Sequence, residues 1–269
     1  QQLKAFTYFL HLSHWDTIEN NLTQLPVAEI TRVELMNVSG ASSAIIKALI
    51  NRGLLREYHK EVGRLNNSDA EPSEKPKPLS QAQQEAYNNI VFQFLKKRVV
   101  LLHGVTSSGK TEVYIHLINK ALKEKKQVLY LLPEIALTVQ MTSRLKRVFG
   151  NKLGIYHSRY SDAERVEIWK KQLSTSPYEV ILGARSAVFL PFQRLGLVII
   201  DEEHEGSFKQ QDPAPRYHAR SAAIMLASYY GAQTLLGTAT PSTESFFNAQ
   251  TGKYGLVQLQ RRYKDIALP

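Results

Sequence analysis

The feature that most constrains the fold is a glycine-rich segment that follows a short apolar run. Residues 99–102 are aliphatic, as expected for a buried strand. The octapeptide 104–111, GVTSSGKT, then matches the phosphate-binding P-loop pattern at each defined position, and a helical stretch, 112–123, follows directly. Strand, loop and helix in this order let backbone N–H groups cradle phosphate oxygens. The alternative is a simple glycine- and serine-rich turn with a surface lysine.

Each part of the loop has a predicted role. Gly104 and Gly109 let the backbone approach an anion without a Cβ in the way. Lys110 is expected to reach the β- and γ-phosphates of ATP, and the Thr111 hydroxyl to ligate Mg²⁺. The predicted nucleotide site also includes the other loop residues, Thr106, Ser107 and Ser108.

The region around this loop alternates strands with helices. Apolar runs predict strands at 99–103, 127–132, 152–156, 179–183, 197–201 and 234–237, with helical segments between most of them. Such alternation is typical of a parallel sheet with helices on both faces. The near-continuous apolar character of 128–132 and 197–200 suits strands buried on both sides.

A second candidate site follows one of these strands. The run LVII at 197–200 ends in Asp201, Glu202, Glu203 and His204. Ligands bind at the carboxyl ends of strands in open α/β sheets. We expect Asp201 to hold Mg²⁺, directly or through water, and Glu202 to accept a proton from the attacking water. His204 is interpreted as a sensor of nucleotide state, with a surface histidine as the alternative.

Charge divides the chain into two parts. Of 34 Lys/Arg and 24 Asp/Glu residues, nine of each lie in residues 1–80, so the net charge of +10 arises wholly in residues 81–269. A basic nucleotide-binding domain suggests a polyanionic partner, with nucleic acid as the first candidate. The alternative is a basic surface that keeps the protein in solution.

Some classes of protein are excluded by what the sequence lacks. There is no Cys, which excludes a disulfide framework and a thiolate metal site. There is no apolar run of membrane-spanning length and no signal peptide pattern. These absences predict a cytoplasmic protein with no membrane partner. Because the chain starts with Gln1 rather than Met, we expect a fragment or a processed product.

The first 62 residues predict a small separate domain. Apolar periodicity predicts helices at 1–12 and 29–37, and a further helix that Ser42 or Ser43 caps and Gly53 ends. A short strand at 54–58 would complete the outline of a winged helix-turn-helix. Contact with DNA and a spacer or protein-contact role are both open. The polar, proline-containing stretch 63–78 predicts a linker, and 79–269 a RecA-like lobe.

Five segments together resemble a known family. GVTSSGKT, PEIALT at 133–138, GARSAVFLPF at 183–192, DEEH at 201–204 and GTATPS at 237–242 stand in the order of superfamily 2 helicase motifs I, Ia, Ib, II and III. The amino-acid sequences of these motifs are similar to those of the PriA family of bacterial primosomal helicases. The stretch SFKQQDPAPRYHAR at 207–220 is also similar to that family. The resemblance is strong over 79–269 and weaker over the first 60 residues.

The resemblance implies further site residues. Gln83 stands where the family recognises adenine, with a helix-surface glutamine as the alternative. Thr138, Arg185 and Ser186 are expected to contact phosphates of a DNA strand. The coupling residues that would relay nucleotide state to the DNA path are expected to be Thr238, Thr240 and Ser242. For each of these residues a purely structural role is the alternative.

The resemblance also implies a function. It predicts part of an ATP-dependent DNA helicase that acts at stalled forks in replication restart, with ATP and Mg²⁺ as cofactors. Its partners would be forked or single-stranded DNA, replication-restart proteins and single-stranded DNA-binding protein, and it would act as a monomer at the bacterial nucleoid. The family's Cys-rich zinc insertion and second lobe have no counterpart in this chain. Alternatives are a translocase that remodels nucleoprotein without separating strands and a P-loop phosphotransferase.

Overall fold

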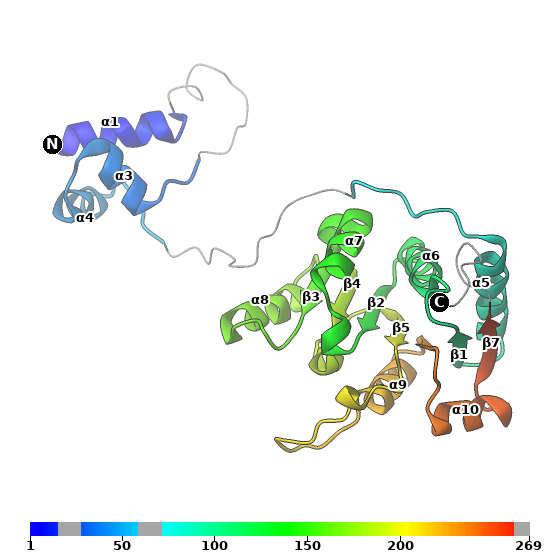
Figure 1. Cartoon of the computed structure of the whole chain (residues 1–269). Helices are drawn as coiled ribbons and strands as arrows, with labels where there is room; N and C mark the ends of the chain where they lie inside the picture. The colour runs from blue at the N-terminus through cyan, green and yellow to red at the C-terminus, as the bar shows by residue number, and fades with distance from the viewer. Residues whose placement is uncertain (16–27, 59–71, 261–269) are drawn as a thin grey trace. The chain divides into compact units, whose positions relative to one another are not determined.

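The computed structural model describes residues 1–15, 28–58 and 72–260 (Figure 1). The chain divides into two compact units, Gln1–Val62 and Gly63–Pro269. Each unit has its own hydrophobic core, and they are described separately.

The described residues of the first unit form three helices around a small core. They are α1 (Gln2–Leu12), α3 (Arg32–Ser39) and α4 (Ser43–Asn51). The Thr31 hydroxyl accepts a hydrogen bond from the backbone N–H of Glu34 and so caps α3. Gly40 ends α3 in the left-handed conformation, at φ 66°, which turns the chain into α4. The core is formed by Ala5, Leu35, Ala41, Ile46 and Leu49.

The prediction of a strand at 54–58 is wrong. Residues 55–58 have no regular secondary structure, and the described residues 1–15 and 28–58 contain no strand with which they could pair. Arg32 instead ties this segment to α3 through an ion pair with Glu57, at 2.9 Å. A β-branched or aliphatic run becomes a strand only when another strand completes its hydrogen bonds.

In the described part of the second unit, residues 72–260, seven strands form one parallel sheet. Its order is β3-β4-β2-β5-β6-β1-β7, and every neighbouring pair is parallel. The strands are β1 (Val99–Gly104), β2 (Gln127–Leu131), β3 (Leu153–Tyr156), β4 (Val180–Gly183), β5 (Leu195–Asp201), β6 (Gln233–Thr238) and β7 (Gly255–Leu259). Six of them match the predicted strands to within two residues, whereas β7 was not predicted.

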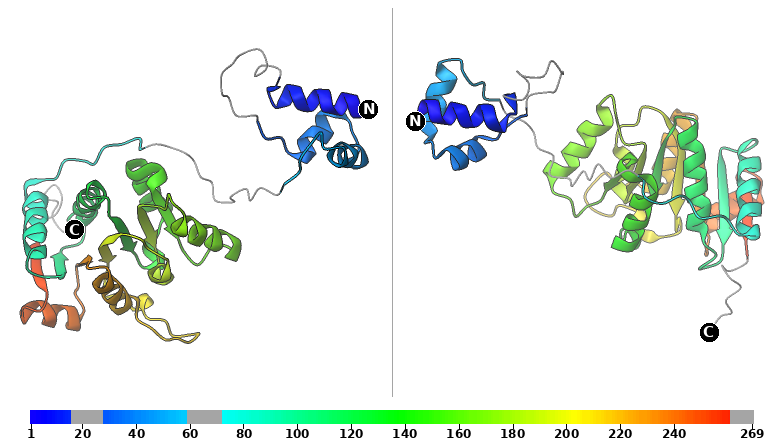
Figure 2. Two further views of the ribbon diagram at one scale, coloured as in Figure 1. Left: turned by 180° about the vertical axis from the view of Figure 1, so that it is seen from behind. Right: turned by 90° about the horizontal axis from the view of Figure 1, so that it is seen from above.

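Helices cover both faces of the sheet, as predicted (Figure 2). Side chains alternate between the faces along each strand: Leu102 lies in one core and Leu101 in the other. One face packs against α5 (Gln81–Phe94), α6 (Lys110–Lys123) and α7 (Val139–Phe149). The other packs against α8 (Asp162–Leu173), α9 (Ala219–Tyr229) and α10 (Thr243–Gln250). The sheet is therefore the middle layer of three.

The parallel arrangement brings the sequence motifs together at the carboxyl ends of the strands. The P-loop follows β1, PEIALT follows β2, GARS follows β4, DEEH follows β5 and GTATPS follows β6. All these segments lie at carboxyl ends of strands, where α/β sheets bind ligands. In the sheet order, β1, β6 and β5 form the half with the P-loop, and β2 and β4 lie in the other half.

The described part of the segment between the units is attached to the second unit. The backbone N–H groups of Ser73 and Glu74 donate to the carbonyl of Arg147 at the end of α7. The Arg147 guanidinium also pairs with the Glu74 carboxylate at 3.0 Å. Residues 59–71, which include most of the predicted linker, lie outside the described residues.

Among the described residues, no single helix is both long and apolar enough to cross a bilayer. The pair α3 and α4, bent by 115°, meets the criteria of length and composition only when the two helices are counted together.

Candidate nucleotide site and its coupling network

The P-loop folds as a tight turn at the N-terminus of α6. Ser107 and Gly109 take left-handed backbone conformations, at φ 62° and 76°. Such a turn aims consecutive N–H groups into one concavity, which is a site for anions. The Lys110 ammonium lies within it and donates to the Gly104 carbonyl at 3.0 Å. A Cβ at Gly104 would lie 3.2 Å from the Lys110 side chain, so glycine keeps that side chain unhindered.

Gln83 is buried against the P-loop rather than exposed on its helix. It completes a capping box with Ser80 at the start of α5, where its Oε1 accepts from the Ser80 N–H at 2.9 Å. Its Nε2 donates to the carbonyls of Ser108 and Gly109, at 3.2 and 3.3 Å. The interpretation as a helix-surface residue is wrong, because Gln83 is 1% exposed. Its recognition of adenine stays a prediction.

Asp201 lies at the end of β5 with two tyrosine hydroxyls as partners. Tyr114 of α6 donates to one carboxylate oxygen at 2.9 Å, and Tyr130 of β2 to the other at 3.3 Å. Burial and the neighbouring Glu202 raise the pKa of Asp201 to about 6, against the opposing effects of the Tyr114 hydrogen bond and of Lys110. The site thus holds a buried carboxylate whose negative charge is only partly compensated.

Gly237 makes room for this arrangement. It is the residue of β6 that pairs with Asp201, and a Cβ there would lie 1.8 Å from the Tyr114 hydroxyl oxygen. Glycine is therefore required at this position for Tyr114 to reach the Asp201 carboxylate.

Glu202 occupies a strained turn after the strand. Its φ of 48° lies in the left-handed region, which costs a non-glycine residue on the order of 1 kcal/mol or more. Its side chain is 36% exposed, so the carboxylate can meet water. This position, next to the buried Asp201, suits the proton acceptor that the sequence predicts.

His204 connects this turn to the end of β6. Its Nδ1 lies 2.8 Å from the Thr238 hydroxyl, and its Nε2 lies 3.3 Å from the Thr240 hydroxyl. The Thr238 hydroxyl also accepts the backbone N–H of Thr240 at 3.0 Å. Both ring nitrogens of His204 therefore face coupling residues named from the sequence. Ser242, the third of them, does not join this group and instead bonds to Glu203.

The three residues expected on the DNA path have different surroundings. Thr138 is exposed, and its hydroxyl caps α7 by accepting the N–H of Met141 at 3.2 Å. Arg185 donates to the backbone carbonyl of Lys209 at 3.0 Å, and Ser186 beside it is half-buried. Thr138 and Arg185 thus have structural contacts, and their phosphate contacts stay predictions.

Exposed apolar side chains accompany these residues. Ile135 and Val139, after β2, are 79% and 82% exposed, and Phe189, after β4, is 53% exposed. Phe189 packs edge-on against Tyr217, with ring centroids 4.8 Å apart. Apolar and aromatic groups on a basic lobe suit the sugars and bases of a single strand.

The side chains present fit Mg-ATP. The Ser108 hydroxyl is buried and has no hydrogen-bond partner among the described residues, so it can donate to a phosphate. Lys110 supplies a cation, and Thr111 and Asp201 supply the oxygen ligands that Mg²⁺ prefers. Within the described ranges, no group of three or more His, Cys, Asp and Glu side chains could hold a metal by itself. The donor set is that of a nucleotide-dependent magnesium site.

Three residues of the site could not be found from the sequence. Tyr114 and Tyr130 hold Asp201, and Arg220 pairs with Glu203 at 2.6 Å. The sequence gives one signal for them: Tyr130 interrupts an aliphatic stretch in β2, and a buried tyrosine hydroxyl needs a hydrogen-bond partner.

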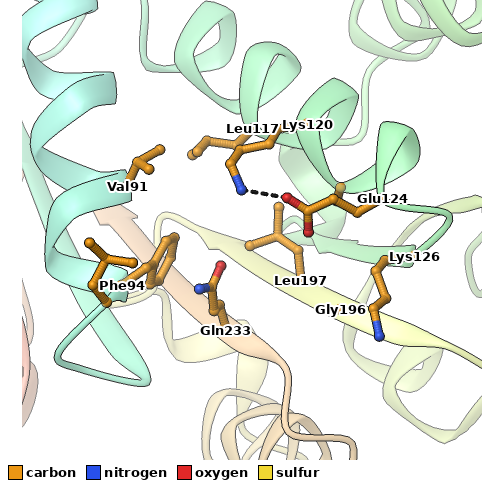
Figure 3. A pocket seen from close by; sticks show the side chains of 11 residues that line it. Val91, Phe94, Leu117, Lys120, Glu124, Lys126, Gly196, Leu197 and Gln233 are labelled. Carbon is orange, nitrogen blue, oxygen red and sulfur yellow. Dashed lines mark hydrogen bonds and ion pairs between the residues drawn. The ribbon is translucent and has the colours of Figure 1, made fainter.

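A pocket at the amino ends of the strands is separate from this site (Figure 3). Its lining includes Leu197 of β5, Gln233 of β6 and Phe94 of α5. Lys120 and Glu124 of α6 also line it and form an ion pair at 2.6 Å. Since Gln233 is the first residue of β6, this pocket lies at the amino ends of the strands, away from the P-loop.

Comparison with models of known protein families shows the family to which the chain belongs. A model described as DEAD/DEAH box helicase matches residues 80–247, and the chain belongs to this family. Its fold is accordingly the RecA-like α/β fold that the alternating strands and helices predict.

The resemblance to PriA helicases is confirmed as well. A model for the winged helix domain of PriA helicases of Bacteroidota matches residues 1–62. The replication restart protein PriA of Bacillus subtilis is 42% identical over 244 residues, which are 90% of this chain and 30% of that protein. PriA of Rickettsia conorii is 37% identical over 269 residues, covering 95% of this chain and 40% of that protein. The chain thus spans about a third of the length of these relatives.

Among solved structures, the chain is similar to the DUF1998 helicase MrfA bound to DNA. The TM-score is 0.48 at 19% identity, covering 68% of this chain and 27% of that one.

Proposed function

We propose that this chain is the nucleotide-binding part of an ATP-dependent DNA helicase that acts in replication restart. The observation that supports this best is the chain of contacts at the carboxyl edge of the sheet. The Glu202–His204 turn lies next to Asp201, and His204 contacts both Thr238 and Thr240. A P-loop enzyme that only transferred a phosphoryl group would have no need to join these acidic residues to a threonine segment.

The roles of the residues follow from their positions. Lys110 and the P-loop N–H groups bind the phosphates of ATP, and Gln83 keeps the loop in place. Mg²⁺, when bound, would neutralise charge on the phosphates, with Thr111 and Asp201 as its protein ligands. Glu202 accepts the proton of the attacking water. His204 senses the nucleotide through its neighbour Glu202, whose carboxylate lies 3.7 Å from the His204 Nδ1, and relays its state to Thr238 and Thr240.

The DNA strand would follow the segments after β2 and β4. Thr138, Arg185 and Ser186 would contact its phosphates, and the exposed apolar side chains of Ile135 and Phe189 its sugars and bases. The net charge of +10 on residues 81–269 favours such a polyanion.

Several finer assignments belong to this proposal. The partners would include forked or single-stranded DNA, replication-restart proteins and single-stranded DNA-binding protein. The protein would act as a monomer in the cytoplasm at the nucleoid. The division into a winged-helix domain at 1–62, a linker at 63–78 and a motor lobe at 79–269 is part of the same proposal. Zinc would bind elsewhere in a longer family member.

The first test is equilibrium binding of a fluorescent ATP analogue by the 269-residue chain in the presence of Mg²⁺. Lys110→Ala should weaken binding about 10- to 100-fold, because it removes a charge-assisted contact to phosphate. Lys123→Ala is the matched control, since Lys123 is exposed in the last turn of the same helix. Equal affinities of the Lys110 variant and the unchanged chain would overturn the proposal.

A strand-displacement assay on a forked duplex separates the proposal from its alternatives, and it requires the chain extended through a second lobe. Strand separation driven by ATP is expected. Movement along DNA without separation of the strands would identify a remodelling translocase. A rate of ATP turnover that does not depend on nucleic acid would identify a phosphotransferase.

A further inference from the structure

The Glu203 side chain is a fully buried carboxylate that the proposed ATP chemistry does not use. Four donors surround it. Arg220 donates through Nη1 at 2.6 Å, Ser242 through its backbone N–H at 2.7 Å and its hydroxyl at 3.0 Å, and Ser245 through its hydroxyl at 2.8 Å. A buried charge with this many donors is paired and held in one geometry.

These donors come from two different elements. Arg220 lies in the first turn of α9, which follows the loop 207–218, whereas Ser242 caps the N-terminus of α10. Arg220 also donates to the Ser242 hydroxyl at 2.6 Å, so the two elements contact each other at this carboxylate. Glu203 therefore fixes the distance between the end of β5, the start of α9 and the start of α10.

Glu203 is also joined to the nucleotide side. It directly follows Glu202, whose left-handed φ redirects the chain between the two side chains. Its own N–H donates to the Gly237 carbonyl of β6 at 3.2 Å. A strained backbone persists only where surrounding contacts over-determine it, and the hydrogen bonds of the Glu203 carboxylate are among the contacts that hold this turn.

Arg220 extends the link toward the segment after β4. The loop that ends at α9 receives hydrogen bonds from Arg185, which donates to the carbonyls of Ser207 and Lys209. Tyr217, one residue before the α9 cap at His218, packs on Phe189. A shift at Glu203 would thus displace groups that lie beside the expected DNA path.

We infer that Glu203 and Arg220 form a positioning pair that transmits the conformation of the Asp201–Glu202 turn to the Ser242 segment and to the loop before α9. This inference deepens the proposed function and rests on it. Both side chains are largely buried and are proposed to act through the residues they contact. The pair affects the coupling between nucleotide binding and DNA binding. This coupling is measured as the ratio of the DNA affinities with and without bound nucleotide.

The test measures binding of a fluorescent single-stranded oligonucleotide to the 269-residue chain, with and without a saturating non-hydrolysable ATP analogue and Mg²⁺. In the unchanged chain the two DNA affinities should differ at least about fivefold, the low end of typical coupling. Glu203→Gln and Arg220→Met should each bring this ratio close to one. Glu244→Gln is the matched control, because Glu244 is 73% exposed and lies 3.7 Å from the same guanidinium.

A double variant, Glu203→Gln with Arg220→Met, distinguishes positioning from simple stability. Each single change leaves an unpaired buried charge or donor and should lower the melting temperature, whereas the double change removes both charges and should recover much of it. The inference expects the coupling ratio to stay near one in the double variant although stability returns. Ser242→Ala, a milder change, should reduce the ratio even where Glu203→Gln does not fold.

The outcomes are distinct. Recovery of coupling together with stability in the double variant would overturn the inference, as would an unchanged ratio in Glu203→Gln. A ratio of one in the unchanged chain, with both ligands bound, would also overturn it and leave the nucleotide- and DNA-binding functions standing. Failure of the unchanged chain to bind either ligand would instead refute the proposed function.

Discussion

Replacing Asp201 by Asn should stabilise the second unit at neutral pH in the absence of Mg²⁺. The pKa of Asp201 is raised from 3.8 to about 6 because the carboxyl group is buried and lies next to Glu202. A shift of roughly two pKa units corresponds to about 3 kcal/mol, at about 1.4 kcal/mol per unit. Keeping this carboxylate ionised inside the fold therefore costs the protein that free energy, and an amide of the same shape avoids the cost.

The gain is an upper bound because the amide changes the hydrogen bonds. Tyr114 and Tyr130 both donate to the carboxylate, whereas Asn has a single acceptor oxygen. One tyrosine must turn to accept from the amide NH₂, at a cost of about 1 kcal/mol. We expect a net gain of about 2 kcal/mol, which is a rise of roughly 4–8 °C in the melting temperature for a domain of this size.

The dependence on pH identifies the cause. A carboxyl group whose folded pKa lies above its unfolded pKa destabilises the fold only when it is ionised. The penalty is absent below pH 3.8, grows as pH rises, and is complete above pH 6. The net advantage of Asp201→Asn should therefore be about 2 kcal/mol at pH 7.5, well under half of that near pH 5, and reversed at pH 3.5, where only the hydrogen-bond cost of about 1 kcal/mol remains.

The assay is differential scanning calorimetry in buffers that contain a metal chelator, with the transition of the larger unit compared between the two proteins. A variant less stable than the unchanged chain at pH 7.5 would show that the carboxylate is not penalised. An advantage of equal size at pH 7.5 and pH 5 would show that ionisation is not its source.

Four further outcomes are expected. Gly237→Ala should destabilise the second unit by about 1–3 kcal/mol, because its Cβ would lie 1.8 Å from the Tyr114 hydroxyl; Gly206→Ala, with no atom within 4 Å, is the control in thermal unfolding. Gln83→Ala should weaken ATP and GTP binding alike, since its amide holds the P-loop, and a loss confined to ATP would favour adenine recognition instead. The affinity for single-stranded DNA should fall with salt at a log–log slope of about −0.7 per phosphate contact, and a flat titration would refute phosphate tracking. The 269-residue chain should hydrolyse ATP little, with or without DNA, because an arginine finger from a second lobe is worth about 10³- to 10⁵-fold; turnover equal to that of a chain extended through that lobe would contradict this.

Much of the second unit could be predicted from its sequence because its strands are buried on both faces. Such strands appear as continuous apolar runs, for example Val128–Leu131, which local pattern alone reveals. The missed strand β7 pairs on one side only, and Gln258 in it is exposed, so the run is short and interrupted. The segment 54–58 shows the converse: two leucines and a tyrosine predicted a strand there, but residues 1–15 and 28–58 contain no strand with which it could pair.

The candidate site could be predicted where its residues are consecutive in the sequence. Lys110 and Thr111, or Asp201 and Glu202, have a fixed local spacing that reflects their chemistry. Tyr114 does not, because the sheet brings it to Asp201 from 87 residues away. Glu203 was visible within its motif, yet its role depends on Arg220 and Ser242, whose proximity only the fold establishes.

The order of strands sets a distance that the protein must bridge. Four inter-strand steps separate β1, which leads into the P-loop, from β4, which leads into the segment of Arg185. At about 4.8 Å per step, the two loops start about 19 Å apart. A γ-phosphate bound at Lys110 therefore cannot reach a DNA phosphate bound at Arg185 by direct contact. Whatever one ligand communicates to the other must therefore travel sideways, through the residues at the ends of the intervening strands and through the loops and helices that pack beside them.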